Sequence, residues 1–223
     1  MFSLFKKRDK YANHYYEYNS AQILGERDYQ AECFYVTSQG QSLFAIITDG
    51  IKDAKIGRSV ALFAIESFKD MYYSGLYKKI PAQRFFEQAV AKTTKALADN
   101  GLEQNRRPAI TALIIEAGFL YVAEVHDNIH GGAVYLCKDN KLQVVRKTKK
   151  ISSVVVSRIK LVGDEVLLLA SDGVTKSLSE MAILHSLSDK HHPNKCQNLK
   201  NLILKKHIRE QENATLIVTE LTL

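Results

Sequence analysis

The sequence predicts an α+β domain in which stacked antiparallel sheets are flanked by helices. Three observations lead to this fold class. Of the 223 residues, 46% are hydrophobic and 25% are charged, which provides enough apolar surface for a sizeable core. Strand-like segments come first, two helical segments follow, and many strands, further helices and one last strand complete the chain. Because strands and helices do not alternate, a doubly wound parallel sheet is disfavoured.

The first part of the chain is expected to hold an edge strand and a hairpin. Residues 1–12 are polar and basic and should form a loose arm, and the tyrosine-rich residues 14–24 fit an edge strand. Residues 33–38 are aromatic and β-branched, and residues 42–48 are almost continuously apolar. Such runs on either side of a short glycine-containing turn predict two paired strands.

Two amphipathic helices are expected next. Apolar residues recur every three or four positions between residues 57 and 73, which predicts a helix with one buried face. A second helix is expected to begin near Pro81 and to end at Asn100-Gly101, since proline suits a first turn and these two residues tolerate a left-handed backbone.

The second half of the chain is expected to be rich in strands. Short apolar runs separated by turn residues predict them. The expected strands are residues 110–116, 119–125, 133–137, 142–145, 151–161, 165–171 and 214–221. Helices are expected at about residues 177–187 and 194–209.

Composition excludes several classes of protein. No apolar run approaches the roughly 18 residues of a membrane span. Three cysteines far apart in the sequence do not make a disulfide framework, so we expect a reducing cytoplasm. The net charge of +7 permits an acidic partner without requiring one. The short basic clusters lack interleaved aromatic residues, which disfavours a nucleic-acid partner.

Two of the buried strands are expected to end in the same way. Each finishes with a hydroxyl residue followed by Asp and Gly, at Asp49-Gly50 and at Asp172-Gly173. A single Asp-Gly after a strand is usually a simple turn. Two such endings in one domain can bring two carboxylates to one edge of a sheet, and a glycine lets a ligand approach the backbone carbonyl.

Two further acidic residues stand where strands begin. Glu32 precedes the strand at 33–38, and Glu212 precedes the strand at 214–221. If these strands are antiparallel neighbours of the two above, four carboxylates meet in one place. Such a cluster needs a cation, and Mg²⁺ or Mn²⁺ suits a site made of oxygens. Arg27 is a candidate for a bidentate contact to an anion.

The segments that carry these residues resemble, in the same order, the motifs of the metal-dependent protein phosphatases of type 2C, in a short bacterial form. The segments are Arg27-Asp28-Tyr29-Gln30-Ala31-Glu32, Thr48-Asp49-Gly50, Ser171-Asp172-Gly173-Val174-Thr175 and Glu212-Asn213-Ala214-Thr215. The resemblance extends from about residue 25 to about residue 218. It implies a four-layer α-β-β-α sandwich, with two antiparallel sheets between helix pairs, in a single phosphatase-like domain at residues 13–223.

The resemblance also implies a centre of two Mg²⁺ or Mn²⁺ ions. The implied metal ligands are Glu32, Asp49, the carbonyl of Gly50, Asp172 and Glu212, with Asp127 as a candidate accessory ligand. Arg27 would hold the substrate phosphate, and Arg27, Asp49 and Asp172 would be the catalytic residues. The implied activity is hydrolysis of phosphoserine or phosphothreonine in a signalling protein by water that two metal ions activate.

Two departures from the motifs leave a second hypothesis open. Glu32 and Glu212 stand where the family has Asp, and each adds a methylene to a site whose ligand distances are tight. The alternative is a catalytically weak or inactive protein with a phosphatase fold that binds a phosphoprotein or a regulatory partner. A third and weaker hypothesis, a basic nucleic-acid-binding protein, rests only on the net charge. Among these three, we favour the enzyme.

Overall fold

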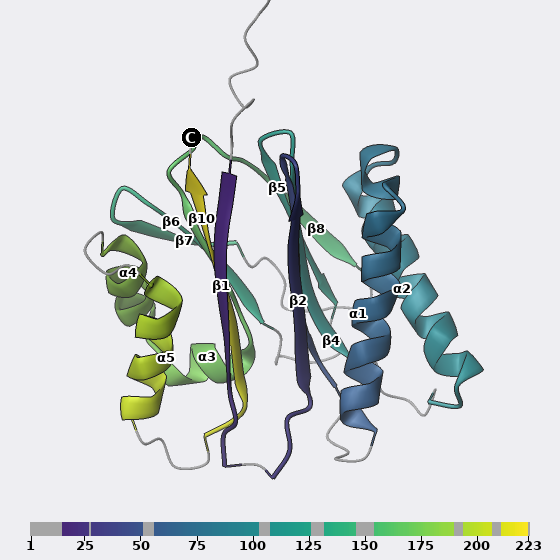
Figure 1. The fold of residues 1–223 in the computed structure, drawn as a ribbon, viewed down its shortest axis with the longest axis horizontal. Helices are drawn as coiled ribbons and strands as arrows, with labels where there is room; N and C mark the ends of the chain where they lie inside the picture. The colour runs from purple at the N-terminus through teal and green to yellow at the C-terminus, as the bar shows by residue number, and fades with distance from the viewer. Residues whose placement is uncertain are drawn as a thin grey trace, which may run out of the picture.

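The computed structural model describes most of the chain and shows the expected fold class. The described residues are 15–26, 28–50, 56–102, 108–125, 132–145, 154–189, 194–206 and 211–222. Within them, two five-stranded antiparallel sheets face each other, and helices cover both outer sides (Figure 1). The predicted α+β sandwich of four layers is confirmed.

One sheet carries most of the first half of the chain. Its strands, in spatial order, are β2 (Glu32–Gln39), β3 (Ser42–Asp49), β4 (Ala109–Glu116), β5 (Phe119–Val125) and β8 (Val155–Lys160). The second sheet contains β1 (Tyr15–Ile23), β10 (Ala214–Thr222), β9 (Val166–Ala170), β6 (Ala133–Lys138) and β7 (Lys141–Val144). The predicted strands are confirmed within the described residues, β1 is an edge strand as expected, and residues 151–153 of the strand predicted at 151–161 lie outside the described residues.

The helices divide between the two outer faces. The helices α1 (Gly57–Tyr73) and α2 (Ala82–Asp99), joined through the 3₁₀ turn η1 (Leu76–Lys78), cover the sheet that contains β2. The other sheet is covered by α3 (Asp172–Ser177), α4 (Glu180–Ser188) and α5 (Lys195–Lys205) (Figure 1). No helix in these ranges has both the length and the apolar character that a membrane crossing requires.

The helix expected at about residues 177–187 is found as α4, which begins at Glu180. A second, short helix, α3, precedes it and was not expected, and the backbone at Leu178 and Ser179 between the two is extended. The Ser179 hydroxyl caps α4 by accepting a hydrogen bond from the Ala182 N–H at 3.3 Å. The helix α3 starts directly after the strand β9, at Asp172, whereas the sequence predicted no helix before about residue 177.

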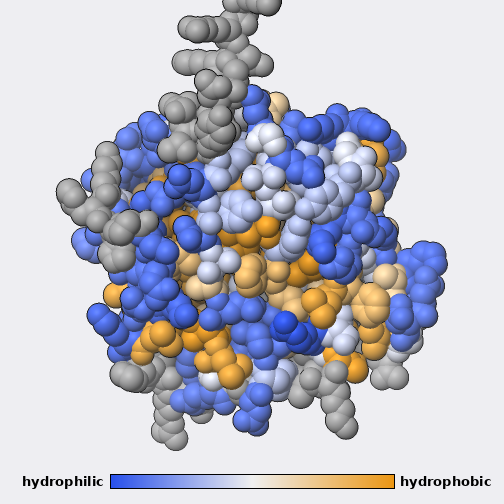
Figure 2. Space-filling model, in the orientation of Figure 1, coloured by the Kyte–Doolittle hydropathy of each residue, from blue (hydrophilic) through white to orange (hydrophobic). Residues whose placement is uncertain are grey.

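Three apolar layers hold the elements together. Along β3, Leu43 and Ile47 face the opposite sheet, while Phe44 and Ile46 face the layer of α1 and α2. This strand is therefore buried on both faces, which explains why its sequence is apolar at nearly every position. A third cluster lies between the second sheet and the helices α3, α4 and α5. Figure 2 shows apolar side chains gathered at the centre of the face drawn, with hydrophilic side chains around them.

Candidate metal centre

Three of the predicted carboxylates come together at one end of the two sheets. Glu32 opens β2 and stands directly opposite Asp49, the last residue of β3. Asp172 follows β9 of the other sheet. One carboxylate oxygen from each of the three residues lies within 4.8 Å of the other two. The expectation that acidic strand ends from different strands converge is confirmed for these three residues.

The carboxylate of Glu32 is the most buried of the three. Only 2% of the residue is exposed, and its Oε2 accepts a hydrogen bond from the Thr215 hydroxyl of β10. Burial raises the pKa of Glu32 to about 8, and repulsion by Asp49 and Asp172 contributes although the Thr215 hydrogen bond acts in the opposite direction. A buried carboxylate beside two others is an environment that a cation stabilises.

The glycines after the two aspartates are required by backbone packing. A Cβ on Gly50 would lie 2.0 Å from the Gly57 carbonyl oxygen, and a Cβ on Gly173 would lie 2.0 Å from the Asn213 carbonyl oxygen. No other residue fits at such distances. The Asp-Gly endings are therefore the points at which each strand end packs against a neighbouring segment, and the proposed role of the Gly50 carbonyl as a ligand stays a prediction.

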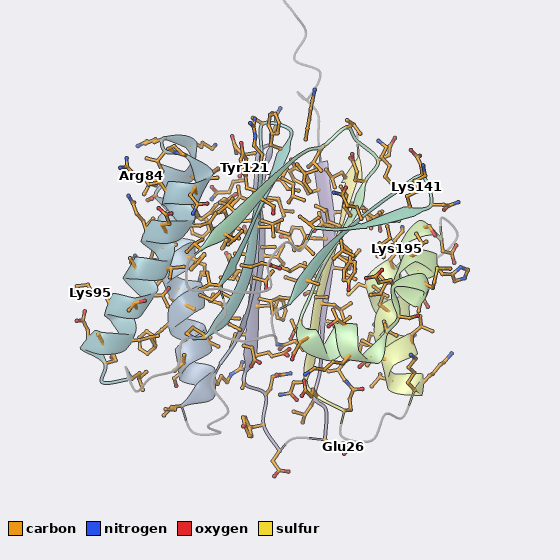
Figure 3. All side chains as sticks on the ribbon, turned by 180° about the vertical axis from the view of Figure 1, so that it is seen from behind. Glu26, Arg84, Lys95, Tyr121, Lys141 and Lys195 are labelled. Atoms are coloured by element: carbon orange, nitrogen blue, oxygen red, sulfur yellow. The ribbon has the colours of Figure 1, made fainter. Side chains whose placement is uncertain are left out.

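Asn213 connects the site to the segment between β1 and β2. Its Oδ1 accepts a hydrogen bond from the Gly25 N–H at 3.1 Å, and its Nδ2 donates to the Tyr29 carbonyl at 2.8 Å. The Glu26 N–H also donates to the Gln211 carbonyl at 2.8 Å. Figure 3 shows Glu26 at the lower end of the molecule, the end at which α3 lies. This segment carries Arg27.

Two predicted site residues, Arg27 and Asp127, lie outside the described residues. Their predicted roles, phosphate binding by Arg27 and accessory metal ligation by Asp127, stay predictions.

Glu212 reaches the other carboxylates through a lysine. The Nζ of Lys176 donates to Asp172 Oδ2 at 2.9 Å and to Glu212 Oε2 at 2.5 Å. Within the described ranges, the group of mutually close carboxylates contains Glu32, Asp49 and Asp172 but not Glu212. The prediction that Glu212 is a metal ligand stays a prediction, and the structure adds a positively charged side chain between it and Asp172.

Sequence reasoning missed Lys176. Partial burial alone would lower the pKa of this lysine, but its hydrogen bonds to Glu212 and Asp172 raise the pKa above its ordinary value. The available signal was its position four residues after Asp172, which is the spacing of ion-paired side chains on a helix. That signal applies only if the helix begins at Asp172.

A small hollow between the sheets lies beside the carboxylates. It is lined by Ile47, Asp49, Ala109 and Thr111 from one sheet and by Gly132, Ser171 and Asp172 from the other. A Cβ on Gly132 would approach the Ala170 carbonyl oxygen to 2.5 Å, so this side of the hollow is tightly packed. The Ser171 hydroxyl accepts a hydrogen bond from the Thr215 N–H at 2.9 Å, which ties the end of β9 to β10.

Comparison of the sequence with protein-family models and with curated proteins finds no match. Solved structures with a similar fold do exist. The Mycobacterium tuberculosis serine/threonine phosphatase PstP/Ppp matches with a TM-score of 0.78 and 15% identity, over 93% of this chain and 99% of that chain. The catalytic domain of the serine threonine protein phosphatase PstP in complex with two manganese ions matches with a TM-score of 0.72 and 16% identity, over 95% and 100%.

A third similar structure also contains a metal. RsbX in complex with magnesium matches with a TM-score of 0.65 and 13% identity, over 93% of this chain and 96% of that chain. At such identities the similarity concerns the fold. This chain has two antiparallel sheets, helices on both outer faces and acidic residues at one common end of the two sheets. It has the fold of the type 2C serine/threonine phosphatases.

Proposed function

We propose that this chain is a metal-dependent phosphatase that hydrolyses phosphoserine or phosphothreonine in proteins. The observation that carries the proposal is the convergence of Glu32, Asp49 and Asp172 from two sheets onto one site. The fold supports it, because the solved structures with this fold include serine/threonine phosphatases, one in complex with manganese. We further propose a cytoplasmic, bacterial signalling role with a phosphorylated protein as substrate or partner.

The residues present fit a hard divalent cation. Glu32, Asp49 and Asp172 offer carboxylate oxygens within 4.8 Å of one another, and oxygen ligands are those that Mg²⁺ and Mn²⁺ prefer. Burial, together with repulsion by Asp49 and Asp172, raises the pKa of Glu32, so the charged form that would ligate a metal is disfavoured unless a cation is bound. These three residues would hold the ion. When bound, such an ion polarises a phosphoryl oxygen and activates water for attack on phosphorus.

The chain itself would orient the reacting groups. Thr215 fixes the carboxylate of Glu32 through its hydroxyl, and Asn213 fixes the segment on both sides of Arg27. We propose that Arg27 holds the substrate phosphate with its planar guanidinium, which suits bidentate contact to an oxyanion. Lys176 supplies a positive charge beside Asp172.

The experiment is hydrolysis of an aryl phosphate and of a phosphoserine peptide, with Mn²⁺ and with excess chelator. We expect turnover that depends on Mn²⁺ and that Asp49→Asn abolishes. The matched control is Asp139→Asn, the same chemical change in the exposed turn between β6 and β7, where φ is 49° and Asn is tolerated. Turnover that persists in chelator, or in Asp49→Asn, would contradict the proposal.

The same assay decides between the proposal and the alternative. Binding of Mn²⁺ and of a phosphoprotein without turnover would favour the catalytically weak phosphatase-fold protein. Nucleic-acid binding that weakens steeply with salt would favour the third hypothesis.

A further inference from the structure

Lys176 lies between Asp172, a member of the carboxylate cluster, and Glu212. Its ammonium group contacts Asp172 at 2.9 Å and Glu212 at 2.5 Å, and both are direct hydrogen-bond distances. The side chain of Asp172 is only 14% exposed, so this contact is not an ordinary surface ion pair. Two of the four carboxylates expected to bind metal are thus already bound to a cation that belongs to the chain.

The structure around α3 holds the lysine in this position. Asp172 and Lys176 lie one helical turn apart on α3, so they face the same side. The Ser177 hydroxyl donates to the Gly173 carbonyl at 2.5 Å, within the same helix. Gln211 Nε2 donates to the Ser177 hydroxyl and to the Glu212 carbonyl, both at 2.9 Å. The end of α3 is thereby fastened to the segment that carries Glu212.

We propose that Lys176 takes the place of one of the two divalent cations implied by the sequence motifs, so that the site binds a single Mn²⁺ or Mg²⁺ at Glu32, Asp49 and Asp172. This inference rests on the proposed metal-dependent function and deepens it. A carboxylate has two oxygens, so Asp172 can contact Lys176 with one and a metal ion with the other. A second ion at Asp172 and Glu212 would have to displace the ammonium group or repel it across a few ångströms.

An ammonium group at this place would also differ chemically from the divalent ion that it replaces. An ammonium group donates hydrogen bonds and offers no empty coordination position, so it cannot activate water as a divalent ion does. With 42% of its side chain exposed, Lys176 can still donate to a phosphate oxygen. The site would then combine one metal ion with one fixed hydrogen-bond donor, in place of two metal ions.

The test is the number of Mn²⁺ ions bound per chain, measured by equilibrium dialysis and by titration calorimetry. We expect one ion for the parent and two for Lys176→Met, which removes the charge and keeps the side-chain length. Lys176→Arg keeps the charge and should bind one ion. The matched control is Lys95→Met, which breaks a lysine–aspartate pair of the same sequence spacing on α2, far from the site (Figure 3).

The outcomes separate this inference from the proposed function. A parent that binds two ions, or a Lys176→Met variant that binds no more ions than the parent, would overturn the inference. A parent that binds no ion would overturn both the inference and the proposed metal-dependent function, whereas a parent that binds two ions would overturn the inference alone. The parent measurement stands by itself if the variant does not fold, as checked by circular dichroism.

Discussion

The hydroxyl of Thr215 donates a hydrogen bond to the carboxylate of Glu32, and this contact joins the two sheets at the candidate metal centre. Thr215 lies on β10 of one sheet and Glu32 on β2 of the other. Both residues are almost fully buried. The hydrogen bond favours the charged form of Glu32, whereas burial and the neighbouring carboxylates favour the neutral form.

Replacing Thr215 by Val removes this hydrogen bond at nearly constant volume. The charged form of Glu32 then loses its partner, so its pKa rises further and fewer chains have an ionised ligand at neutral pH. We expect the affinity for Mn²⁺ at pH 7 to fall by about tenfold, which corresponds to about 1.4 kcal/mol, near the lower end of the range for a hydrogen bond to a charged group. Titration calorimetry of the parent and the variant measures the affinity for Mn²⁺. Thr219→Val on the same strand is the control, and an equal loss in both variants would contradict the expectation.

The stability of the metal-free protein should depend on pH through Glu32. The pKa of Glu32 is raised from its ordinary value of 4.5 to about 8 in the folded chain, first by burial. Between these values the folded state holds more protons than the unfolded state, so stability falls as the pH rises. Urea unfolding in chelator from pH 5 to pH 9 should show a loss of stability on the order of 4 kcal/mol.

The Glu32→Gln variant provides the control for this pH dependence. The glutamine cannot ionise, so the part of the slope that Glu32 causes should disappear while that of other groups remains. Parallel stability curves for the parent and the variant would show that Glu32 does not titrate in this window.

Mn²⁺ should stabilise the folded parent because the carboxylates of the folded state bind it and those of the unfolded state are far apart. At a concentration of 100 times the dissociation constant the gain is about 2.7 kcal/mol. Asp49→Asn should lose this gain and, without metal, should melt at or above the parent temperature because repulsion with Glu32 and Asp172 is relieved. Thermal unfolding with and without Mn²⁺ tests both statements, and a full Mn²⁺ gain in the variant would disprove the site.

Gly173→Ala should destabilise the protein strongly. The added Cβ would lie 2.0 Å from the Asn213 carbonyl oxygen, a backbone atom that cannot turn aside as the end of a flexible side chain can. We expect a loss of about 2–4 kcal/mol in urea unfolding, as for other cases of overpacking and strain. Gly40→Ala is the control: nothing lies within 4 Å of its Cβ, so only the positive φ costs energy, about 1 kcal/mol. Equal losses of stability in the two variants would contradict the expectation, because they would mean that the Asn213 carbonyl shifts away from the new Cβ at little cost.

The sequence predicted most of the fold because most of its signals are local. The helix α1 runs from Gly57 to Tyr73, as its apolar periodicity indicated. The pairing of Glu32 with Asp49 follows from a hairpin with a short turn, which leaves little choice of register. The convergence with Asp172 was predicted only on the assumption that the strands are neighbours, and it needed the motif resemblance for support.

The role of Lys176 could not be predicted in the same way. Gly173, Val174 and Thr175 have low helix propensity, so local signals favoured a turn after Asp172. The helix α3 forms there because the chain packs tightly against Asn213 and because Gln211 and Ser177 bond to each other, contacts between residues more than 30 positions apart. Where tertiary contacts outweigh propensity, the register of an ion pair such as Asp172–Lys176 is not visible in the sequence.

The division of the site between two sheets has a consequence for the kinetics of folding. Glu32 and Asp49 meet as soon as one hairpin forms, but Asp172 and Thr215 join them only when the second sheet docks, more than 120 positions further along the chain. Contacts of such long sequence separation form late. A cation at this site would therefore bind only after both sheets have formed and docked. It would leave the rate of folding nearly unchanged and would slow unfolding, the step in which the sheets separate.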